Sequence, residues 1–474
     1  MINQRMQREI KKYILLIAGF AVTFTAAAQS FRAAYFLEGV TTRHRLNPAL
    51  MSEQNYVSIP GLGNTGAGAQ GNIGLTDFIY KYDDPTGKYD LTTFMSSTVG
   101  REQFLSKLHD INRINVHSEI TILGTGFHKW GGFNTIELTL RSNSNTNLPY
   151  ELFDFMKSGM DQTEGAAYQI RDVRSISEAY AELAFGHARK ISEKVAVGAK
   201  AKLLLGGGYL DGHISQLDVT MGQEQWKVEA NGTILGSVDG GKFKTENDGK
   251  GNHIKGIDVD SPGPSGWGLA ADMGLDYKLT HDLTLSAALT DLGFITWDKV
   301  LRGATLNEPY YFDGFESIEL DDKEESDKDF DEQLKELGDD LGDLAKFYEQ
   351  NETSGKTTMI AANLRLGAEY RMPFYRRLSA GFLWTTRFHE LHTWTEGRLY
   401  ANMSPSKWFD FSVNYGLSNL ASSMGWILNF HPGGFNFFIG SDQMVLKVNS
   451  QGVPLNKLNA GILMGVNITF GERH

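Results

Sequence analysis

Three short stretches of the chain combine residue types and spacings that other proteins use for binding or catalysis. Residues 61–66 (GLGNTG) match the glycine pattern of dinucleotide-binding loops, which binds phosphate only between a strand and a helix. Here Pro60 precedes the stretch, and residues 66–74 are too rich in glycine to open a helix. The glycines therefore indicate close packing of the backbone rather than a nucleotide site.

The second stretch, residues 327–332 (DKDFDE), alternates carboxylates as a calcium-binding loop does. Such a loop needs glycine at its sixth position and a bidentate glutamate at its twelfth. Glu332 and Gly338 stand at these two positions. A solvated acidic helix explains the stretch better, and we expect no metal site there.

The third stretch is HELH, in which His389 and His392 lie three residues apart instead of the four of a zinc-binding helix. We interpret it as a loop at an outer turn. The chain has no Gly-x-Ser-x-Gly elbow and no ordered triad, although triads are recognised by geometry. It also has no cysteine, which excludes disulfides, thiolate metal sites and cysteine nucleophiles. We therefore expect no enzyme, no cofactor and no catalytic or metal-binding residue.

The elements that position these stretches are long strands. From Trp267 to Leu279 every second residue is apolar, and the alternation restarts after the turn at residues 280–282. Each arm is longer than the roughly 5 to 6 residues of a globular strand and matches the roughly 9 to 11 of a transmembrane strand. This hairpin predicts Leu275 and Leu285 facing lipid, with Asp272 and Asp276 facing the lumen.

Similar alternation recurs along the chain. Further hairpins are predicted at residues 117–142, 178–205 and 357–388, and single strands at 394–403, 408–417, 423–431, 434–441 and 457–470. With one strand before residue 80, the sequence predicts an all-β fold: a closed antiparallel transmembrane β-barrel of about 14 strands (12–16) over residues 67–474. The mean hydropathy of −0.30 fits a barrel, because half of each strand faces a polar lumen.

Connection lengths give the orientation. The turns alternate between short ones, which we assign to the periplasm, and long ones, which we assign to the cell exterior. Residues 297–356 form the long acidic extracellular loop, since residues 316–349 hold fifteen acidic residues and four lysines. Short helices are predicted in the outer segments at residues 101–111, 148–160 and 329–348, and a strand pair near 213–236 extends beyond the membrane.

The N-terminus predicts the compartment. Four basic residues precede the apolar run 14–24, and Ala26, Ala27 and Ala28 follow it. Residues 1–28 are therefore predicted to be a secretory signal peptide that is cleaved after Ala28. Residues 29–66 form an N-terminal segment that could plug the lumen. We expect a protein of the cell outer membrane, and its net charge of −12 disfavours nucleic acid as a partner.

Charged residues on the inward faces of the strands have mixed signs. We interpret them as a salt-bridged polar interior, because buried charges must pair where water is scarce, and we assign no ligand-binding residue among them. The set comprises Glu182, Lys200, Lys202, Asp272, Asp276, Arg365, Glu369, Glu396, Arg398 and Asp410.

Four stretches resemble an uncharacterised outer-membrane β-barrel family of Bacteroidota: residues 43–50 (RHRLNPAL), 181–207, 283–297 and 465–471. Asn47-Pro48-Ala49 also resembles the start of the long-chain fatty-acid transporter (FadL-like) barrels. That resemblance implies 14 strands, an N-terminal segment inside the barrel and a channel or transporter for small hydrophobic solutes. A related branch serves gliding and type IX secretion. Resemblance to that branch implies an alternative function, that of a non-enzymatic structural or secretion-accessory barrel. The expected partners are outer-membrane lipid and either a small hydrophobic ligand or envelope and secretion proteins.

Overall fold

The computed structural model describes residues 32–81, 91–94, 96, 98–158, 165–222, 225–260, 263–306, 308–312, 345–443 and 457–471. The predicted signal peptide, residues 1–28, lies outside these ranges. So does nearly all of the predicted acidic helix at residues 329–348, of which 345–348 are described.

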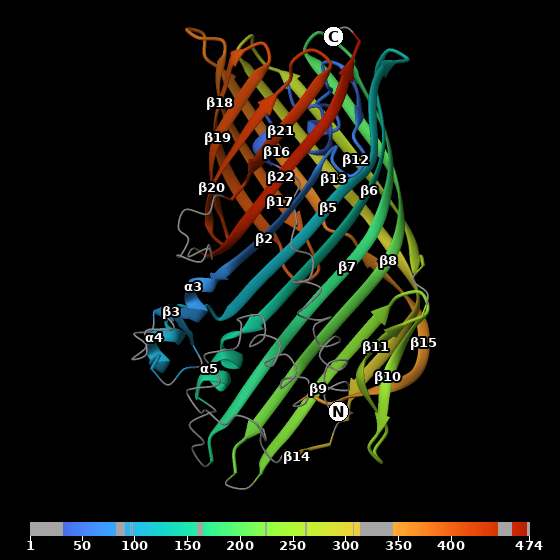
Figure 1. Cartoon of the computed structure of the whole chain (residues 1–474), viewed down its shortest axis with the longest axis vertical. Helices are drawn as coiled ribbons and strands as arrows, with labels where there is room; N and C mark the ends of the chain where they lie inside the picture. Colours follow the sequence, from blue (N-terminus) through green and yellow to red (C-terminus); the bar gives the residue numbers. More distant parts are fainter. Residues whose placement is uncertain are drawn as a thin grey trace.

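The strand pairing closes into an antiparallel barrel of 14 strands, as the alternation predicts (Figure 1). The first strand has two parts, β1 (Asn55–Ser58) and β2 (Thr65–Gly74). Then follow β5 (Ile111–Lys129), β6 (Gly132–Pro149), β7 (Ala167–Lys190), β8 (Val195–Thr220), β12 (Gly266–Lys278), β13 (Leu283–Thr305), β15 (Phe347–Met359) continued by β16 (Ala362–Arg371), β17 (Leu378–Phe388), β18 (Trp394–Ser406), β19 (Phe409–Ser418), β20 (Ser422–Phe430), β21 (Phe435–Ser441) and β22 (Lys457–Phe470). The last strand pairs with both parts of the first, so the ring has no free edge.

Glycines interrupt the first strand between β1 and β2. Gly61 has a φ of +75°, and a Cβ at Gly63 would overlap the side chain of Ser58. Across the interruption, the amide of Val466 donates to the carbonyl of Leu62 at 2.8 Å. The GLGNTG stretch therefore packs closely against neighbouring residues in the barrel wall, as its composition predicts.

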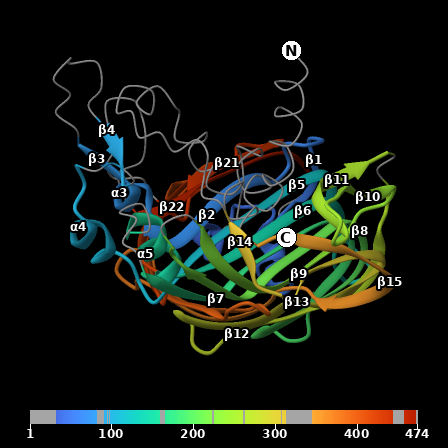
Figure 2. The ribbon, with the colours of Figure 1, turned by 90° about the horizontal axis from the view of Figure 1, so that it is seen from below.

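Short turns and long connections lie at opposite ends of the barrel, which we call the turn end and the loop end (Figure 1). At the loop end β7, β8 and β13 continue far past the neighbouring strands. Four further strands of the same sheet lie there: β9 (Trp226–Ser237), β10 (Gly241–Asn247), β11 (Asn252–Val259) and β14 (Tyr310–Phe312). The predicted strand pair near 213–236 is confirmed by the pairing of β8 with β9. Figure 2 shows these long strands from the loop end.

Small elements also cover the loop end. They are α3 (Leu75–Phe78), β3 (Ile79–Lys81), β4 (Leu91–Thr93), α4 (Arg101–Leu105) and α5 (Tyr150–Ser158). Phe104 and Phe153 of the helices pack with Ile170, Leu217 and other inward residues of β7 and β8 in an apolar cluster. The helix expected at 101–111 ends early, because the chain joins β5 at Ile111. None of the helices in the described ranges is long and apolar enough to cross a bilayer.

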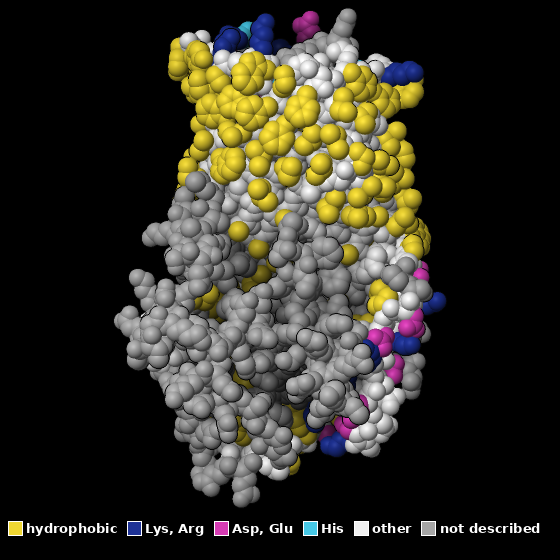
Figure 3. All heavy atoms as spheres, in the orientation of Figure 1, with side chains coloured by type: hydrophobic (Ala, Val, Ile, Leu, Met, Phe, Trp, Pro, Cys, Tyr) yellow, Lys and Arg dark blue, Asp and Glu magenta, His cyan; other side chains and the backbone are white. Residues whose placement is uncertain are grey.

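Figure 3 shows an apolar band on one face of the turn-end half of the barrel. Exposed large hydrophobic residues occur on strands all round the ring. Leu275 is 40% exposed and Leu285 is 36% exposed on the outer surface, whereas Asp272 is 1% exposed inside. Asp276 is only partly buried, because it lies near the turn end. The alternating pattern therefore predicted the lipid-facing side correctly, since side chains of a strand point alternately to its two faces.

Two predicted boundaries are wrong. The barrel begins at Asn55 instead of residue 67, since β1 pairs with β22 and β5. The segment 297–356 is not a loop throughout, because β13 continues to Thr305 and β15 begins at Phe347. These extensions pair with each other beyond the apolar band, Arg302 opposite Gln350, so they need no lipid-facing alternation to be stable as strands.

Candidate functional site: the occluded lumen

Residues 32–54, the N-terminal segment, lie inside the turn-end half of the barrel (Figure 1, dark blue). Ala33, Val40 and Asn47 are fully buried there. Two short 3-10 turns, Arg32–Ala34 and Arg43–Arg45, fold the segment compactly enough to fit. Buried side chains fill the lumen at this level.

Asn47-Pro48-Ala49 is seated against a recess in the barrel wall. Gly198 of β8 and Gly274 of β12 are opposite each other in the sheet, and a Cβ on either one would overlap this tripeptide. Asn47 Nδ2 donates to the carbonyl of Leu275 at 3.2 Å, while Asn47 Oδ1 accepts from the amide of Ala49 at 3.0 Å. The paired glycines thus allow the backbone of the segment to touch the wall.

Arg45 links the segment to β5 and β6. Its guanidinium donates to Thr121 Oγ1 at 2.7 Å and lies 3.3 Å from Glu137 and 3.5 Å from Glu119. On the other side of Glu137, Lys200 Nζ lies 2.9 Å from its carboxylate. Each of these charges therefore has an opposite charge beside it, as burial requires.

Arg32 forms a second ionic anchor on the other side of the lumen. Its guanidinium lies 3.0 Å from Asp442 and 3.3 Å from Glu396, and it stacks 4.5 Å from the ring centre of Trp394. The carboxylate of Asp442 also accepts from the amide of Ala33 at 2.8 Å. The segment is thus tied to strands from both ends of the sequence.

A β-bulge in β13 brings Asp291 into the lumen. Thr290 and Asp291 both point inward, and Asp291 has a φ of +61°, so the alternation changes phase at this point. The Asp291 carboxylate lies 2.6 Å from Lys202 and 2.9 Å from Arg141, and Lys202 also pairs with Asp272 at 2.8 Å. Strict alternation would have turned this carboxylate toward lipid.

The HELH loop crosses the lumen at the loop end, where residues 389–393 form what we call the strap. Asn115 Nδ2 of β5 donates to His392 Nε2 at 3.0 Å, and Asn145 Nδ2 of β6 donates to His389 Nε2 at 3.3 Å. Arg174 of β7 lies 2.5 Å from Glu390. Because β5 to β7 stand across the ring from β17 and β18, the strap ties opposite walls together.

Both strap histidines are kept neutral by their surroundings. Burial, followed by the charge of Arg387, lowers the pKa of His389 to about 3. Burial and the charge of Arg113 lower the pKa of His392 to about 4. Neutral rings are required here, because a protonated nitrogen could not accept the amide hydrogen bonds.

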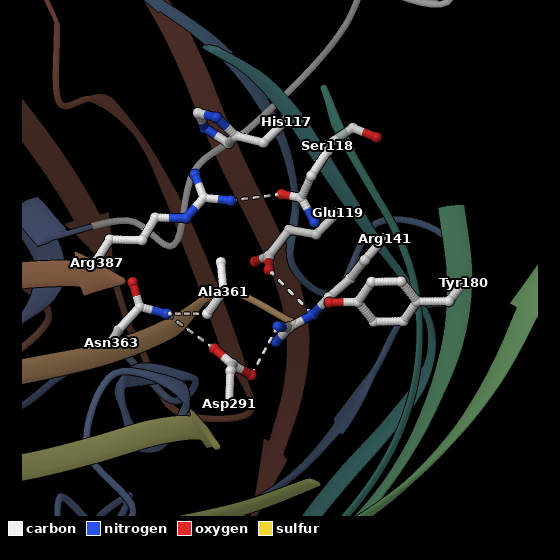
Figure 4. Close-up of a pocket in the computed structure, with 10 residues that line it drawn as sticks. His117, Ser118, Glu119, Arg141, Tyr180, Asp291, Ala361, Asn363 and Arg387 are labelled. Atoms are coloured by element: carbon white, nitrogen blue, oxygen red, sulfur yellow. Dashed lines mark hydrogen bonds and ion pairs between the residues drawn. The ribbon is translucent and has the colours of Figure 1, made fainter. Parts of the chain in front are cut away.

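A chamber of about 50 Å³ remains between the N-terminal segment and the strap (Figure 4). Most of its lining is polar. The residues that line it are His117, Ser118, Glu119, Arg141, Asn143, Tyr180, Asp291, Ala361, Asn363 and Arg387. Since a cavity that holds one water molecule has a volume of about 10 to 15 Å³, the chamber has room for a few waters or one small solute.

The structure places most of the predicted inward charges inside. Asp276 and Glu369 are partly buried, and the remaining eight are at most 5% exposed: Glu182, Lys200, Lys202, Asp272, Arg365, Glu396, Arg398 and Asp410. They come together with residues that the sequence did not single out, among them Arg45, Glu119, Glu137 and Asp291. The polar alternation of residues 111–129 was a signal for Glu119, whereas nothing in the sequence marked the bulge at Asp291.

The architecture defines a transmembrane β-barrel with an occluded, ion-paired lumen. The chain belongs to a family of unknown function (DUF5723), whose sequence profile matches residues 48–442. No curated protein sequence matched it.

Three solved structures share its general architecture. The toluene transporter TbuX of Ralstonia pickettii has 10% identity and a TM-score of 0.41, covering 97% of this chain and 98% of that one. The toluene transporter TodX of P. putida has 8% identity and a TM-score of 0.40, covering 94% and 96%. A FadL homologue of Pseudomonas aeruginosa has 12% identity and a TM-score of 0.39, covering 97% and 98%. These likenesses are too distant to bear on function, and the barrel is defined by its own strand pairing.

Proposed function

We propose that this protein is a gated solute channel of the outer membrane, with its loop end outside the cell and the N-terminal segment as its plug. One observation carries the proposal: two separate elements occlude the lumen, and polar contacts tie both to the wall. Hydrogen bonds and ion pairs can exchange with water, so both elements can move without breaking the strand ladder. A barrel that served only as a rigid wall would gain nothing from an exchangeable closure.

The solute class follows from the lining of the route. Passage of small hydrophobic solutes, which the FadL-like resemblance implies and which the names of the toluene transporters state for those proteins, needs an apolar path. At the loop end the apolar cluster around Phe104 and Phe153 is buried, so it offers no open apolar surface to a solute. The chamber itself is lined by Arg387, Glu119 and Asn363, which favours small polar solutes at the narrowest part of the route.

Conductance in planar bilayers tests the proposal. The full chain should show low conductance, and Arg32→Ala combined with Arg45→Ala should raise it, because both ionic anchors of the N-terminal segment are lost. Arg376→Ala, an exposed arginine at a turn, is the matched control and should leave conductance unchanged. The proposal fails if protease accessibility shows that the segment has been released while conductance stays at the wild-type level.

A second candidate function has its own observation. At 24 and 26 residues, β7 and β8 are more than twice as long as a membrane crossing requires, so they form a wall beyond the apolar band. Such a wall suits a structural or secretion-accessory barrel that binds envelope proteins. Cross-linking on intact cells through a cysteine at Lys242, on β10, tests this candidate, since the chain has no other cysteine. A discrete cross-linked partner supports it, and only monomer argues against it.

A further inference from the structure

We propose that the chamber is a binding site for one small anion of the carboxylate or oxyanion class, with Arg387 and His117 as the groups that receive it. The inference deepens the proposed function, on which its role in transport rests, by naming a solute class for the same lumen. It depends on which polar groups around the chamber already have partners and which do not.

Arg387 differs from three other cations of the chamber and its surroundings. Arg45, Arg141 and Lys202 each lie within 3.5 Å of at least one carboxylate. Arg387 donates to the neutral Asn143 Oδ1 at 3.1 Å, and it has no carboxylate at ion-pair distance among the residues that the structure describes. The same amide links Arg387 indirectly to an acid, since Asn143 Nδ2 donates to Glu178 at 3.3 Å. A guanidinium in the lumen thus keeps donors for a ligand.

His117 supplies the second group of the proposed site. It is 5% exposed and lines the same chamber as Arg387 (Figure 4). Neither of its ring nitrogens has a hydrogen-bond partner among the described residues. A buried imidazole without partners costs free energy unless something else binds it. A small acceptor in the chamber would satisfy the ring N–H and the guanidinium together.

The acidic groups of the chamber do not oppose an anion, because they are already engaged. Glu119 accepts from Asn64 at 2.6 Å and pairs with Arg45 at 3.5 Å. Asp291 pairs with Lys202 and Arg141 and accepts from Asn363 at 3.1 Å. The free hydrogen-bonding capacity of the chamber is therefore mainly donor capacity.

The size of the chamber limits the ligand. A volume of about 50 Å³ accommodates acetate, nitrate or bicarbonate but excludes a long acyl chain. A planar oxyanion also matches the fork of donors that a guanidinium presents. The site therefore binds small oxyanions. It can bind the head group of a slightly larger acid only if the strap moves.

Acetate is the probe for the test, with acetamide as its neutral isostere. The carbon-13 relaxation of labelled acetate is titrated against the purified full chain in detergent. We expect saturable binding of acetate, at least tenfold weaker binding of acetamide, and displacement by nitrate. Arg387→Gln should weaken acetate binding roughly tenfold or more, because a charge-assisted hydrogen bond is lost. Arg387→Lys should retain part of the affinity, and Arg376→Gln, at an exposed turn, should retain all of it.

The outcomes separate this inference from the proposed function. If the relaxation of labelled acetate shows no saturable change, the chamber holds only water and the inference is overturned. Equal binding of acetate by wild type and Arg387→Gln also overturns it. Equal affinity for acetamide also overturns it. If acetate binds but release of the N-terminal segment does not raise conductance, the site stands and the channel is refuted. If release raises conductance but acetate does not bind, the channel stands and the site is refuted. A folded-barrel gel shift in each variant confirms that the comparison uses folded protein.

Discussion

The two closures of the lumen are built differently. At the N-terminal segment, Arg45 and Arg32 each contact two carboxylates, and the segment also packs against paired glycines of the wall. At the strap, two amide–imidazole hydrogen bonds and the Arg174–Glu390 pair, with Glu390 about half exposed, hold the loop across the barrel. An exposed pair contributes little, about 0 to 1 kcal/mol, so the strap is the weaker closure. We therefore expect the loop end to open first.

The largest effect is expected in the charge network between the two closures. Asp291→Ala removes the carboxylate shared by Lys202 and Arg141, leaving both cations with fewer partners. Breaking a buried network of this kind costs about 3 to 5 kcal/mol. Urea unfolding in lipid vesicles measures the loss. A loss below about 1 kcal/mol, the range of exposed pairs, would show that water reaches the network. The ion pairs of the network and of the strap would then not differ in strength.

The lipid-facing side gives the next effect. Met273 is 52% exposed in the middle of β12, so Met273→Arg should destabilise the barrel by about 2 to 4 kcal/mol. Leu285 lies close to the turn at residues 279–282, and Leu285→Arg should cost about 0 to 1 kcal/mol. The sequence suggests that Ala288→Arg is tolerated in a watery lumen. The structure corrects this, because Ala288 is 3% exposed beside the filled interior. Equal losses at Met273 and Leu285 would contradict the placement of the band.

The next effect concerns the glycine recess, where the N-terminal segment contacts the barrel wall. Gly198→Val should push Asn47-Pro48-Ala49 away and cost about 1 to 3 kcal/mol through overpacking. Arg43 and Arg45 should then become cleavable by trypsin while the barrel remains folded. Gly397→Ala is the matched control, since a Cβ there meets only ordinary contacts at 3.5 Å. Protection of the segment in Gly198→Val would show that the recess does not seat it.

The strap gives the smallest effect at neutral pH, and its effect grows as the pH falls. Its histidines have pKa values of about 3 and 4 in the closed state, below the ordinary 6.5. Above pH 6.5 both states are neutral, so closure is fully stable. As the pH falls from 6.5 toward 4, the open state gains protons first and closure weakens. Labelling of a cysteine at Leu391, measured relative to a free thiol at the same pH, should accelerate in this window. His389→Gln combined with His392→Gln should remove the dependence. Constant labelling from pH 7 to 4 would contradict the assignment.

The sequence predicted the repeating strands and missed most of the contacts that occur only once. Alternation over residues 267–294 identifies the lipid face because the side-chain period of a strand is two. The bulge at Asp291 adds one residue to this period and reverses the faces after it, and no composition rule marks the position. HELH was correctly expected to be a loop, but its contacts with Asn115 and Asn145 depend on which strands stand across the ring. The partners of Arg45 were hidden for the same reason.

The closure of the ring has a consequence for the order of assembly. The first strand pairs with β22, and the amide and side chain of Arg32 both bind Asp442, which lies 410 residues further along the chain. Contacts of such sequence separation form late, because the entropy of closing a long loop must be lost before they form. The segment that fills the lumen therefore has no complete seat until the last strands are in place. An interrupted or truncated chain would yield an open sheet with its N-terminus unbound, which is the form that proteases and chaperones would meet.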